Sequence, residues 1–308
     1  MSDSLIRVEI VAPVHNRRDI TVQCLRSLSK INSDGLDVHI VIVDDGSTDG
    51  TGDAIRTEFP DVEVVEGDGN LWFTEGTNTG IRAALRHNPR YILMINDDAV
   101  FDADFLRHMV ETAENHQGSV VGALLLLWDS PHRLFQVAPV WDTWKGGWRH
   151  WYHQTVWTVP KSPWKVDVIV GNCVLVPAKA VLEAGFMDSK KYPNFGDVEY
   201  TPRMKRLGWK LLIEPRARVF CQPNNVPKSM LKLPFVERLN VLFFDKGAPG
   251  NFRRRFRSMW DTAPSKIDAV LAFNIFIARI ILGKNWESEW GMGHTEKPLS
   301  STFEHEIV

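Results

Sequence analysis

The sequence predicts an α/β fold built on a mainly parallel, Rossmann-like sheet flanked by helices, and two observations favour it. Short apolar runs alternate with segments whose apolar residues recur at helical spacing, which is the pattern of successive βαβ units. The mostly apolar run at residues 91–95 passes directly into Asn96-Asp97-Asp98. This is expected of a strand that is buried on both faces and ends at the ligand-binding edge of an open sheet.

The elements follow from the same pattern. Strands are expected at residues 8–12, 38–43, 62–66, 91–95, 120–127, 166–171, 173–176 and 209–213. Helices are expected at residues 19–28, 51–59, 77–85, 103–114, 178–184 and 198–207. Because consecutive crossovers are right-handed, the loops that follow the parallel strands should lie along one edge of the sheet.

Length and composition limit the class of protein. A chain of 308 residues fits one large α/β domain with an appendage, or two domains. Prolines and a basic run at residues 253–257 follow residue 225, so we expect a sheet domain at residues 1–225 and a helical extension at residues 226–308. A net charge of −2 gives no reason to expect a nucleic-acid partner. Three separated cysteines, no signal-peptide pattern and no long apolar stretch predict a cytoplasmic protein.

Four of the predicted strand-end loops carry polar side chains. They are the segment His15–Arg17, the pair Asp44-Asp45, the segment Asn96–Asp98 and the region of Asp197. One acidic loop is commonly a helix cap. Four that meet at one edge are harder to explain in that way, because clustered carboxylates destabilise a fold unless they bind a ligand or a metal.

Six segments together resemble a known family. In order they read APVHNRR, VIVDDGSTDGT, GNLWFTEGTNTGI, MINDDAV, VGNCVLVP and FGDVEYTPRMKRLGW. They resemble the family-2 inverting glycosyltransferases of GT-A fold over about residues 8–218. The segments GNLWFTEGTNTGI and INDDAV look most like those of bacterial enzymes that build surface polysaccharides, including rhamnosyltransferases. The resemblance implies transfer of a sugar from a UDP- or dTDP-linked donor to a saccharide or lipid-linked saccharide.

The resemblance also implies donor-side roles. The residues that would hold the nucleoside are Pro13, His15, Asn16, Arg17, Asp44 and Asp45, with Asn78 reaching the base or ribose. Asn96-Asp97-Asp98 would be the DxD element of the family, although Asn96 departs from its first position. Asp98 would bind a divalent metal, Mn²⁺ or Mg²⁺, and Gln222 stands where relatives carry a metal-binding His.

On the acceptor side, Asp197 would be the general base, and Glu199 is the alternative. The Glu that usually precedes the base is Gly196 here, and Asp197 could instead only cap the next helix. Gly171 and Asn172 would line the acceptor site. A tryptophan-rich insert at about residues 139–164 carries Trp144, Trp148 and Trp151. These indoles could stack on sugars or form an oligomer or membrane contact.

Other interpretations stay open. The arginines among aromatics at residues 252–260 could touch anionic lipid headgroups or face solvent, and the chain could be a homodimer. A sugar nucleotidyltransferase would need a glycine-rich, lysine-bearing loop after the first strand, which HNRRD is not. A carbohydrate-binding or assembly subunit that has lost turnover is the rival from another class.

Overall fold

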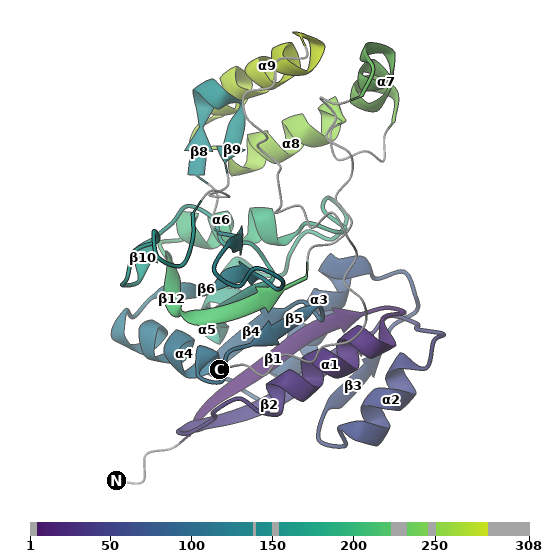
Figure 1. The fold of residues 1–308 in the computed structure, drawn as a ribbon, viewed down its shortest axis with the longest axis vertical. Coiled ribbons are helices and arrows are strands. Elements are labelled where there is room, and N and C mark those ends of the chain that lie inside the picture. The colour runs from purple at the N-terminus through teal and green to yellow at the C-terminus, as the bar shows by residue number, and fades with distance from the viewer. Residues whose placement is uncertain (1–4, 138–139, 150–153, 223–232, 246–250, 283–308) are drawn as a thin grey trace.

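The computed structural model describes residues 5–137, 140–149, 154–222, 233–245 and 251–282. Its centre is a ten-stranded mixed sheet (Figure 1). The main path runs through β10 (Trp164–Lys165), β12 (Lys210–Cys221), β6 (Ser119–Leu127), β11 (Cys173–Pro177), β4 (Tyr91–Ile95), β1 (Ile6–Val14), β2 (Leu36–Asp44) and β3 (Glu63–Glu66). Two short strands pair beside it: β5 (Ala99–Phe101) with β12, and β7 (Leu134–Gln136) with β6.

The four neighbouring strands β4, β1, β2 and β3 pair in parallel. Their carboxyl ends therefore lie at one edge, as the sequence predicts, and the loops after β1, β2 and β4 meet there. β11 is antiparallel to both β4 and β6, so its first residue, Cys173, lies beside Ile95 at the same edge. The fold class predicted from the sequence is confirmed.

Helices cover both faces of the sheet because neighbouring residues of each strand point to opposite faces. One core contains Ile10 and joins α1 (Arg18–Leu28) and α4 (Phe105–Asn115) to the sheet. The other contains Val11 and joins α3 (Trp72–Leu85), α5 (Ala178–Ala184) and α6 (Asp197–Arg206). The helix α2 (Thr51–Glu58) packs beside α1 and β3.

Three elements differ from the sequence prediction. The helix α3 begins at Trp72, five residues before the predicted start at residue 77. Its start coincides with backbone N–H groups of Leu71 and Trp72 that donate to Asp45. The last strand, β12, runs to Cys221 because it pairs with both β6 and β5, whereas residues 166–171 form no regular strand.

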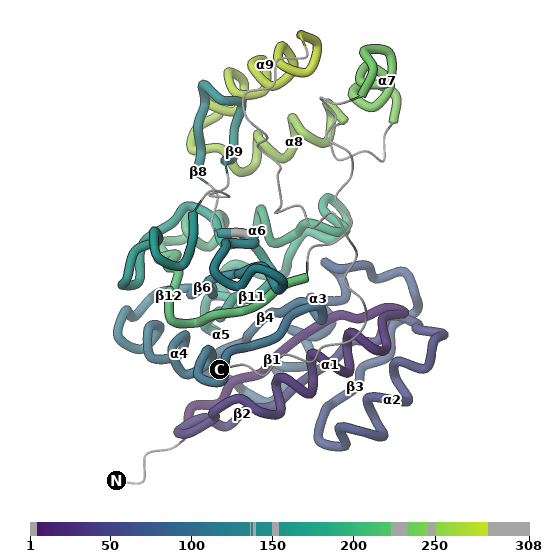
Figure 2. Tube along the Cα trace, in the orientation of Figure 1, coloured from purple at the N-terminus to yellow at the C-terminus, as the bar shows by residue number. Residues whose placement is uncertain are grey.

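The C-terminal helices form a separate layer at the end of the molecule away from β1–β3 (Figures 1 and 2). They are α7 (Phe235–Leu239), the π-helical turn η3 (Asn240–Phe244), α8 (Phe252–Thr262) and α9 (Lys266–Leu282). The hairpin β8 (Val140–Asp142) and β9 (Gly147–Arg149), joined by the short helix η1 (Thr143–Lys145), packs on them. Within the described residues, no helix is long and apolar enough to cross a membrane. A domain boundary near residue 225 lies outside the described residues and stays a prediction.

Candidate functional site

The acidic turn after β4 is held by a single arginine. Asp97 and Asp98 are only 3% and 6% exposed. The Arg17 guanidinium bridges them, with Nη1 2.8 Å from Asp97 Oδ1 and Nη2 3.1 Å from Asp98 Oδ2. The Thr21 hydroxyl donates to the second oxygen of Asp97 at 2.8 Å. Asp97 thus has both oxygens bonded, whereas Asp98 Oδ1 and Asn96 Oδ1 are buried without a hydrogen-bond partner among the described residues.

The proximity of the two carboxylates contributes to the pKa of Asp97. Burial raises the pKa of Asp97 to about 6, opposed by Arg17 and reinforced by the charge of Asp98. Burial works against the charged form of Arg17, but the two aspartates raise the pKa of its guanidinium. Arg17 therefore acts as the counter-ion of the acidic pair.

The site fits a divalent cation bound through few protein ligands. Asp98 offers a buried carboxylate oxygen with no hydrogen-bond partner in the described part of the chain, and hard cations prefer oxygen ligands. The Gln222 backbone donates to the Asp98 carbonyl at 3.3 Å, so Gln222 lies beside the acidic turn. The described residues contain no cluster of three or more His, Cys, Asp or Glu side chains able to hold a metal. A cation here would complete its coordination with water or with a ligand's phosphates.

The loops after β1 and β2 are joined by hydrogen bonds around Asn16. Its side-chain oxygen accepts from Thr48 N at 2.7 Å, and its backbone donates to Ser47 Oγ at 2.9 Å. The Asp44 carboxylate accepts from Ser47 N at 3.1 Å. Asn16 has a φ of +50°, a left-handed conformation in which Asn is enriched. These polar residues build one wall at the sheet edge.

Asp45 organises the segment that leads into α3. One oxygen accepts from Gly69 N at 2.8 Å and the other from the backbones of Leu71 and Trp72 at 3.0 and 3.1 Å. Its carbonyl lies 2.6 Å from His15 Nδ1. Trp72 is 61% exposed with a φ of +57°, which is a true outlier for a bulky residue. Such strain concentrates at functional sites, and sequence reasoning did not single out Trp72.

Pro13 and Asn78 lie on the inner side of α3. A Cβ on Gly76 would come within 2.7 Å of the Pro13 ring, so the glycine lets the helix pack against β1. Asn78 is buried, and its amide exchanges two hydrogen bonds with the backbone of Met187, at 2.9 and 3.0 Å. Asn78 thus holds the loop around Met187, and its contact with a base or ribose stays a prediction.

Asp197 begins α6 and reaches the same edge through Gly171. Its carboxylate accepts from Gly171 N at 2.8 Å, and burial raises the pKa of Asp197. A Cβ on residue 171 would come within 2.7 Å of the Asp197 Cβ, so this approach requires glycine. The next residue, Asn172, accepts from Asn96 N at 3.2 Å. The fold thus connects Asp197 to the acidic turn through two residues.

Gly196 has no room for a larger residue. Its backbone donates to Thr74 Oγ1 at 3.1 Å, and a Cβ would come within 2.5 Å of Thr74 Cγ2. The Thr74 hydroxyl in turn donates to the Tyr192 carbonyl at 2.5 Å. Thr74, on α3, therefore fixes the backbone next to Asp197. Sequence reasoning missed this residue, because its partners are more than 100 residues away.

Glu199 is already engaged by arginines of its own helix. It pairs with Arg203 at 3.0 Å and with Arg206 at 3.3 Å. Asp197, by contrast, has no cationic partner among the described residues. Of the two carboxylates, only Glu199 is ion-paired within the described residues, and the choice of base stays a prediction.

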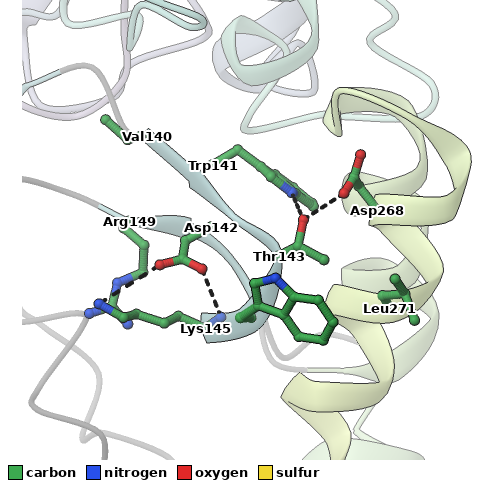
Figure 3. Close-up of a pocket in the computed structure, with 9 residues that line it drawn as sticks. Val140, Trp141, Asp142, Thr143, Lys145, Arg149, Asp268 and Leu271 are labelled. Atoms are coloured by element: carbon green, nitrogen blue, oxygen red, sulfur yellow. Dashed lines mark hydrogen bonds and ion pairs between the residues drawn. The ribbon is translucent and has the colours of Figure 1, made fainter.

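The tryptophan-rich insert packs on the C-terminal helices. Trp148 Nε1 donates to Thr262 Oγ1 at 2.8 Å, and its ring meets Trp141 edge-on at 5.1 Å. Trp144 is 71% exposed beside a hollow of about 530 Å³ between the hairpin and α9 (Figure 3). Trp151 lies outside the described residues. The insert is thus anchored by Trp148, with Trp144 available to another surface.

Comparisons with known proteins give one family match and several similar solved structures. Residues 9–154, just under half of the chain, match the model of Glycosyl transferase family 2. No match was found among curated proteins. Among solved structures, GalNAc-T7 with UDP, GalNAc and Mn²⁺ is similar with a TM-score of 0.60 and 13% identity, over 88% of this chain and 54% of that one. This chain therefore spans about half the length of that structure.

Two further structures are similar. The mannosyltransferase PcManGT of Pyrobaculum calidifontis, with GDP-Man and Mn²⁺, gives a TM-score of 0.50 at 16% identity, over 91% of this chain and 76% of that one. TarS of S. aureus gives 0.55 at 12% identity, over 89% of this chain and 43% of that one. At such identities the likeness establishes the fold alone. The comparisons therefore give a GT-A-like fold for this chain, with a family match that covers residues 9–154.

Proposed function

We propose that this chain is an inverting glycosyltransferase that moves a sugar from a UDP- or dTDP-linked donor to a saccharide or lipid-linked saccharide. Construction of bacterial surface polysaccharide is the role we expect for it, in the cytoplasm. One observation carries the proposal. The buried pair Asp97–Asp98, with an Asp98 oxygen that lacks a hydrogen-bond partner among the described residues, is connected through Asn172 and Gly171 to the carboxylate of Asp197.

The donor side follows from charge. The diphosphate of a nucleotide sugar is an anion, and the buried acidic pair would repel it unless a cation lies between them. A Mn²⁺ or Mg²⁺ ion held by Asp98, with Gln222 beside it, would supply positive charge to the leaving diphosphate. The Mn²⁺ in the structures of GalNAc-T7 and PcManGT supports this assignment. The wall formed by Pro13, His15, Asn16 and Asp44 would hold the nucleoside.

The chemistry needs one base on the acceptor side. The acceptor oxygen forms a bond to the anomeric carbon while the bond from that carbon to the diphosphate breaks. Attack from the face opposite the leaving group inverts the configuration. Asp197 takes the proton of the acceptor hydroxyl, and its raised pKa makes it a stronger base than an ordinary aspartate. Gly171, Asn172 and Trp144 would line the acceptor site.

Two variants test the proposal. Asp98→Ala should abolish Mn²⁺-dependent binding of a nucleoside diphosphate, measured by calorimetry. Asp197→Asn should keep that binding and lower turnover by about 10²-fold or more, the scale of a lost general base. Asp61→Ala, an exposed carboxylate on the turn before β3, is the matched control. Unchanged metal dependence in Asp98→Ala would refute the metal assignment. A larger loss of turnover in Glu199→Gln than in Asp197→Asn would show that Glu199, and not Asp197, is the base.

A non-catalytic binding or assembly subunit is favoured by one observation. Gly196 stands where the family's usual glutamate would be, and Thr74 fills the space that its side chain would need. A subunit of this kind would bind nucleotide sugars but show neither transfer nor donor hydrolysis with Mn²⁺.

A nucleotidyltransferase would instead release pyrophosphate from a nucleoside triphosphate and a sugar phosphate. Hydrolysis of the donor in the presence of Mn²⁺, without release of pyrophosphate, would contradict both the non-catalytic subunit and the nucleotidyltransferase.

A further inference from the structure

The helix α9 carries an apolar face that the described part of the protein leaves uncovered. Positions 267, 270, 274, 278 and 281 recur at intervals of three or four and so lie on one side of the helix, and positions 271 and 282 border the same side. The large apolar side chains among them are all exposed: Ile267, Val270, Leu271, Ile281 and Leu282. We call these five residues the α9 face. The opposite side, with Ala269, Ala272 and Ile280, is buried.

The apolar surface continues beyond α9. Leu271 lines the same hollow as Val140 and Trp144 of the hairpin (Figure 3). On α7, Phe235 and Val236 are exposed, and the following Arg238 donates to the carbonyl of Ile280 at 3.1 Å, which ties α7 to α9. In Figures 1 and 2, α9 and α7 form the end of the molecule farthest from β1–β3.

This concentration is unusual for a surface. Of the 19 large apolar side chains that are exposed among the described residues, 12 lie in the hairpin and the C-terminal helices, which make up less than a fifth of the chain. Exposed apolar side chains are ordinary when scattered singly, but a contiguous patch marks an interaction site. We therefore expect another molecule to cover this apolar surface.

The charge of these segments indicates which partner. Residues 140–149, 233–245 and 251–282 carry nine Lys or Arg against five Asp or Glu, a net charge of +4 in a chain of net charge −2. Arg253, Arg257 and Trp260 are exposed on one side of α8, because positions four and three apart share a side. A second copy of the chain would bring two positive surfaces together, whereas an anionic lipid surface complements them.

We propose that the α9 face binds the surface of an anionic lipid bilayer, with the exposed arginines of α8 supplying positive charge close to that surface. The helix α9 lies in the plane of the interface with its apolar side among the acyl chains, as amphipathic helices do. Trp260 lies at headgroup level, where indoles are enriched at membrane interfaces. Asn274 lies on the same side of α9, between Leu271 and Ile281 of the α9 face. This polar residue and the charged residues Asp268 and Arg279 are consistent with a helix that lies on the bilayer.

The surface is linked to the candidate site by α8. The Tyr192 hydroxyl and the Lys191 ammonium both bind Asp261 of α8, and the Tyr192 carbonyl accepts from Thr74, which holds Gly196 beside Asp197. A bilayer bound at the α9 face would thus orient the acceptor side of the protein toward lipid-linked molecules. Membrane binding itself does not rest on the proposed function, and it is measured without turnover.

Co-sedimentation of the full-length protein with lipid vesicles tests the proposal. Phosphatidylcholine vesicles with and without phosphatidylglycerol serve as the two surfaces. The triple variant Ile267→Ser, Leu271→Ser and Ile281→Ser should lose at least about tenfold in partition coefficient, because each side chain loses its burial in the acyl region. The matched control is Leu182→Ser, which removes an exposed leucine from α5 on the sheet domain.

Charge is tested in the same assay. Arg253→Gln with Arg257→Gln should weaken binding to the anionic vesicles by about fivefold for each arginine removed, and added salt should weaken binding of the parent. Lys179→Gln with Lys210→Gln, two exposed lysines of the sheet domain, should bind as the parent does. Circular dichroism and thermal melting verify that every variant is folded.

Three results would overturn the proposal. The first is a parent protein that does not sediment with anionic vesicles. The second is equal binding by the parent and the folded triple variant. The third is a parent that sediments as a dimer while the triple variant is a monomer with unchanged vesicle binding, which would make the α9 face a contact between two copies. Loss of vesicle binding with intact donor hydrolysis supports the surface and leaves the proposed function standing.

Discussion

Replacement of Arg17 by glutamine tests the electrostatics of the site most directly. The guanidinium is the only cationic group within ion-pair distance of Asp97 and Asp98 among the described residues, at 2.8 and 3.1 Å. Without it, two buried carboxylates lie side by side with no counter-charge. The fold can respond by protonating one of them, by binding a metal cation, or by losing stability.

The size of the effect follows from burial. Breaking a fully buried pair costs about 3–5 kcal/mol, but the Arg17 side chain is 34% exposed and solvent screens part of its charge, so we expect about 2 kcal/mol. For a protein of this size that is a fall in Tm of about 5 °C.

The sign of the pH dependence is also determined. In the parent, the pKa of Asp97 is already raised to about 6 by burial, so the folded state binds this proton more tightly than the unfolded chain does. Loss of Arg17 raises the folded-state pKa further. The added penalty is present above that pKa and disappears as the pH falls toward the unfolded value of about 4. The Tm difference between the parent and Arg17→Gln should therefore shrink between about pH 8 and about pH 5.

Thermal melting at both pH values, with and without Mn²⁺, is the assay. Mn²⁺ should raise the Tm of Arg17→Gln by more than that of the parent, because the variant lacks the competing cation. Arg18→Gln, an exposed neighbour, is the control and should melt like the parent. A Tm loss that is equal at both pH values and unaffected by Mn²⁺ would show that Arg17 stabilises the fold through packing and not as a counter-ion.

Four further predictions concern the rest of the site. Thr74→Val should lower kcat with little change in the Michaelis constant of the donor, and Thr74→Ser should restore it, because only the hydroxyl accepts from Gly196; equal losses in both variants would contradict a positioning role. Trp72→Ala should raise the dissociation constant of the nucleoside diphosphate in calorimetry without lowering Tm, since the indole is exposed; unchanged binding would exclude it from the donor site. The apparent pKa of the acidic limb of the pH–rate profile should be higher than that of an ordinary aspartate, because burial raises the pKa of Asp197. An apparent pKa of about 4 would argue against Asp197 as the base. Trp144→Ala should raise the Michaelis constant of the acceptor and leave donor hydrolysis unchanged, whereas Trp148→Ala should lower Tm through its lost contact with Thr262. The opposite pattern would make Trp148 the acceptor contact and Trp144 the structural anchor.

Local signals in the sequence were sufficient for the parallel strands β1 to β4 and for the acidic turn. The run at residues 91–95 is apolar without interruption and ends in Asn96-Asp97-Asp98, and the structure has both the buried strand β4 and the turn at the expected edge. Period and burial are properties of a single segment, so such elements can be read locally. The same reasoning failed at the start of α3, because the helix begins where the backbone binds Asp45, 27 residues before Trp72.

Partners distant in the chain account for what was missed. The pairing of Arg17 with Asp97 spans 80 residues, and the expected contact of Arg17 with a nucleoside stays a prediction. The contact of Thr74 with Gly196 spans 122 residues, and that of Trp148 with Thr262 spans 114. The pattern of residues within one segment does not predict which side chain of a distant element will contact that segment.

The sequence by itself therefore determined the α/β class, the order of the strands and helices of the parallel half, and the carboxylates Asp97, Asp98 and Asp197 as candidate site residues. These depend on hydrophobic periodicity and on residues that follow a strand or begin a helix. Only the tertiary structure decided that Arg17 neutralises the acidic pair, that Thr74 occupies the space beside Gly196, and that α9 leaves an apolar face uncovered. Each of these depends on which surfaces meet when distant segments pack, and packing is a property of the whole chain.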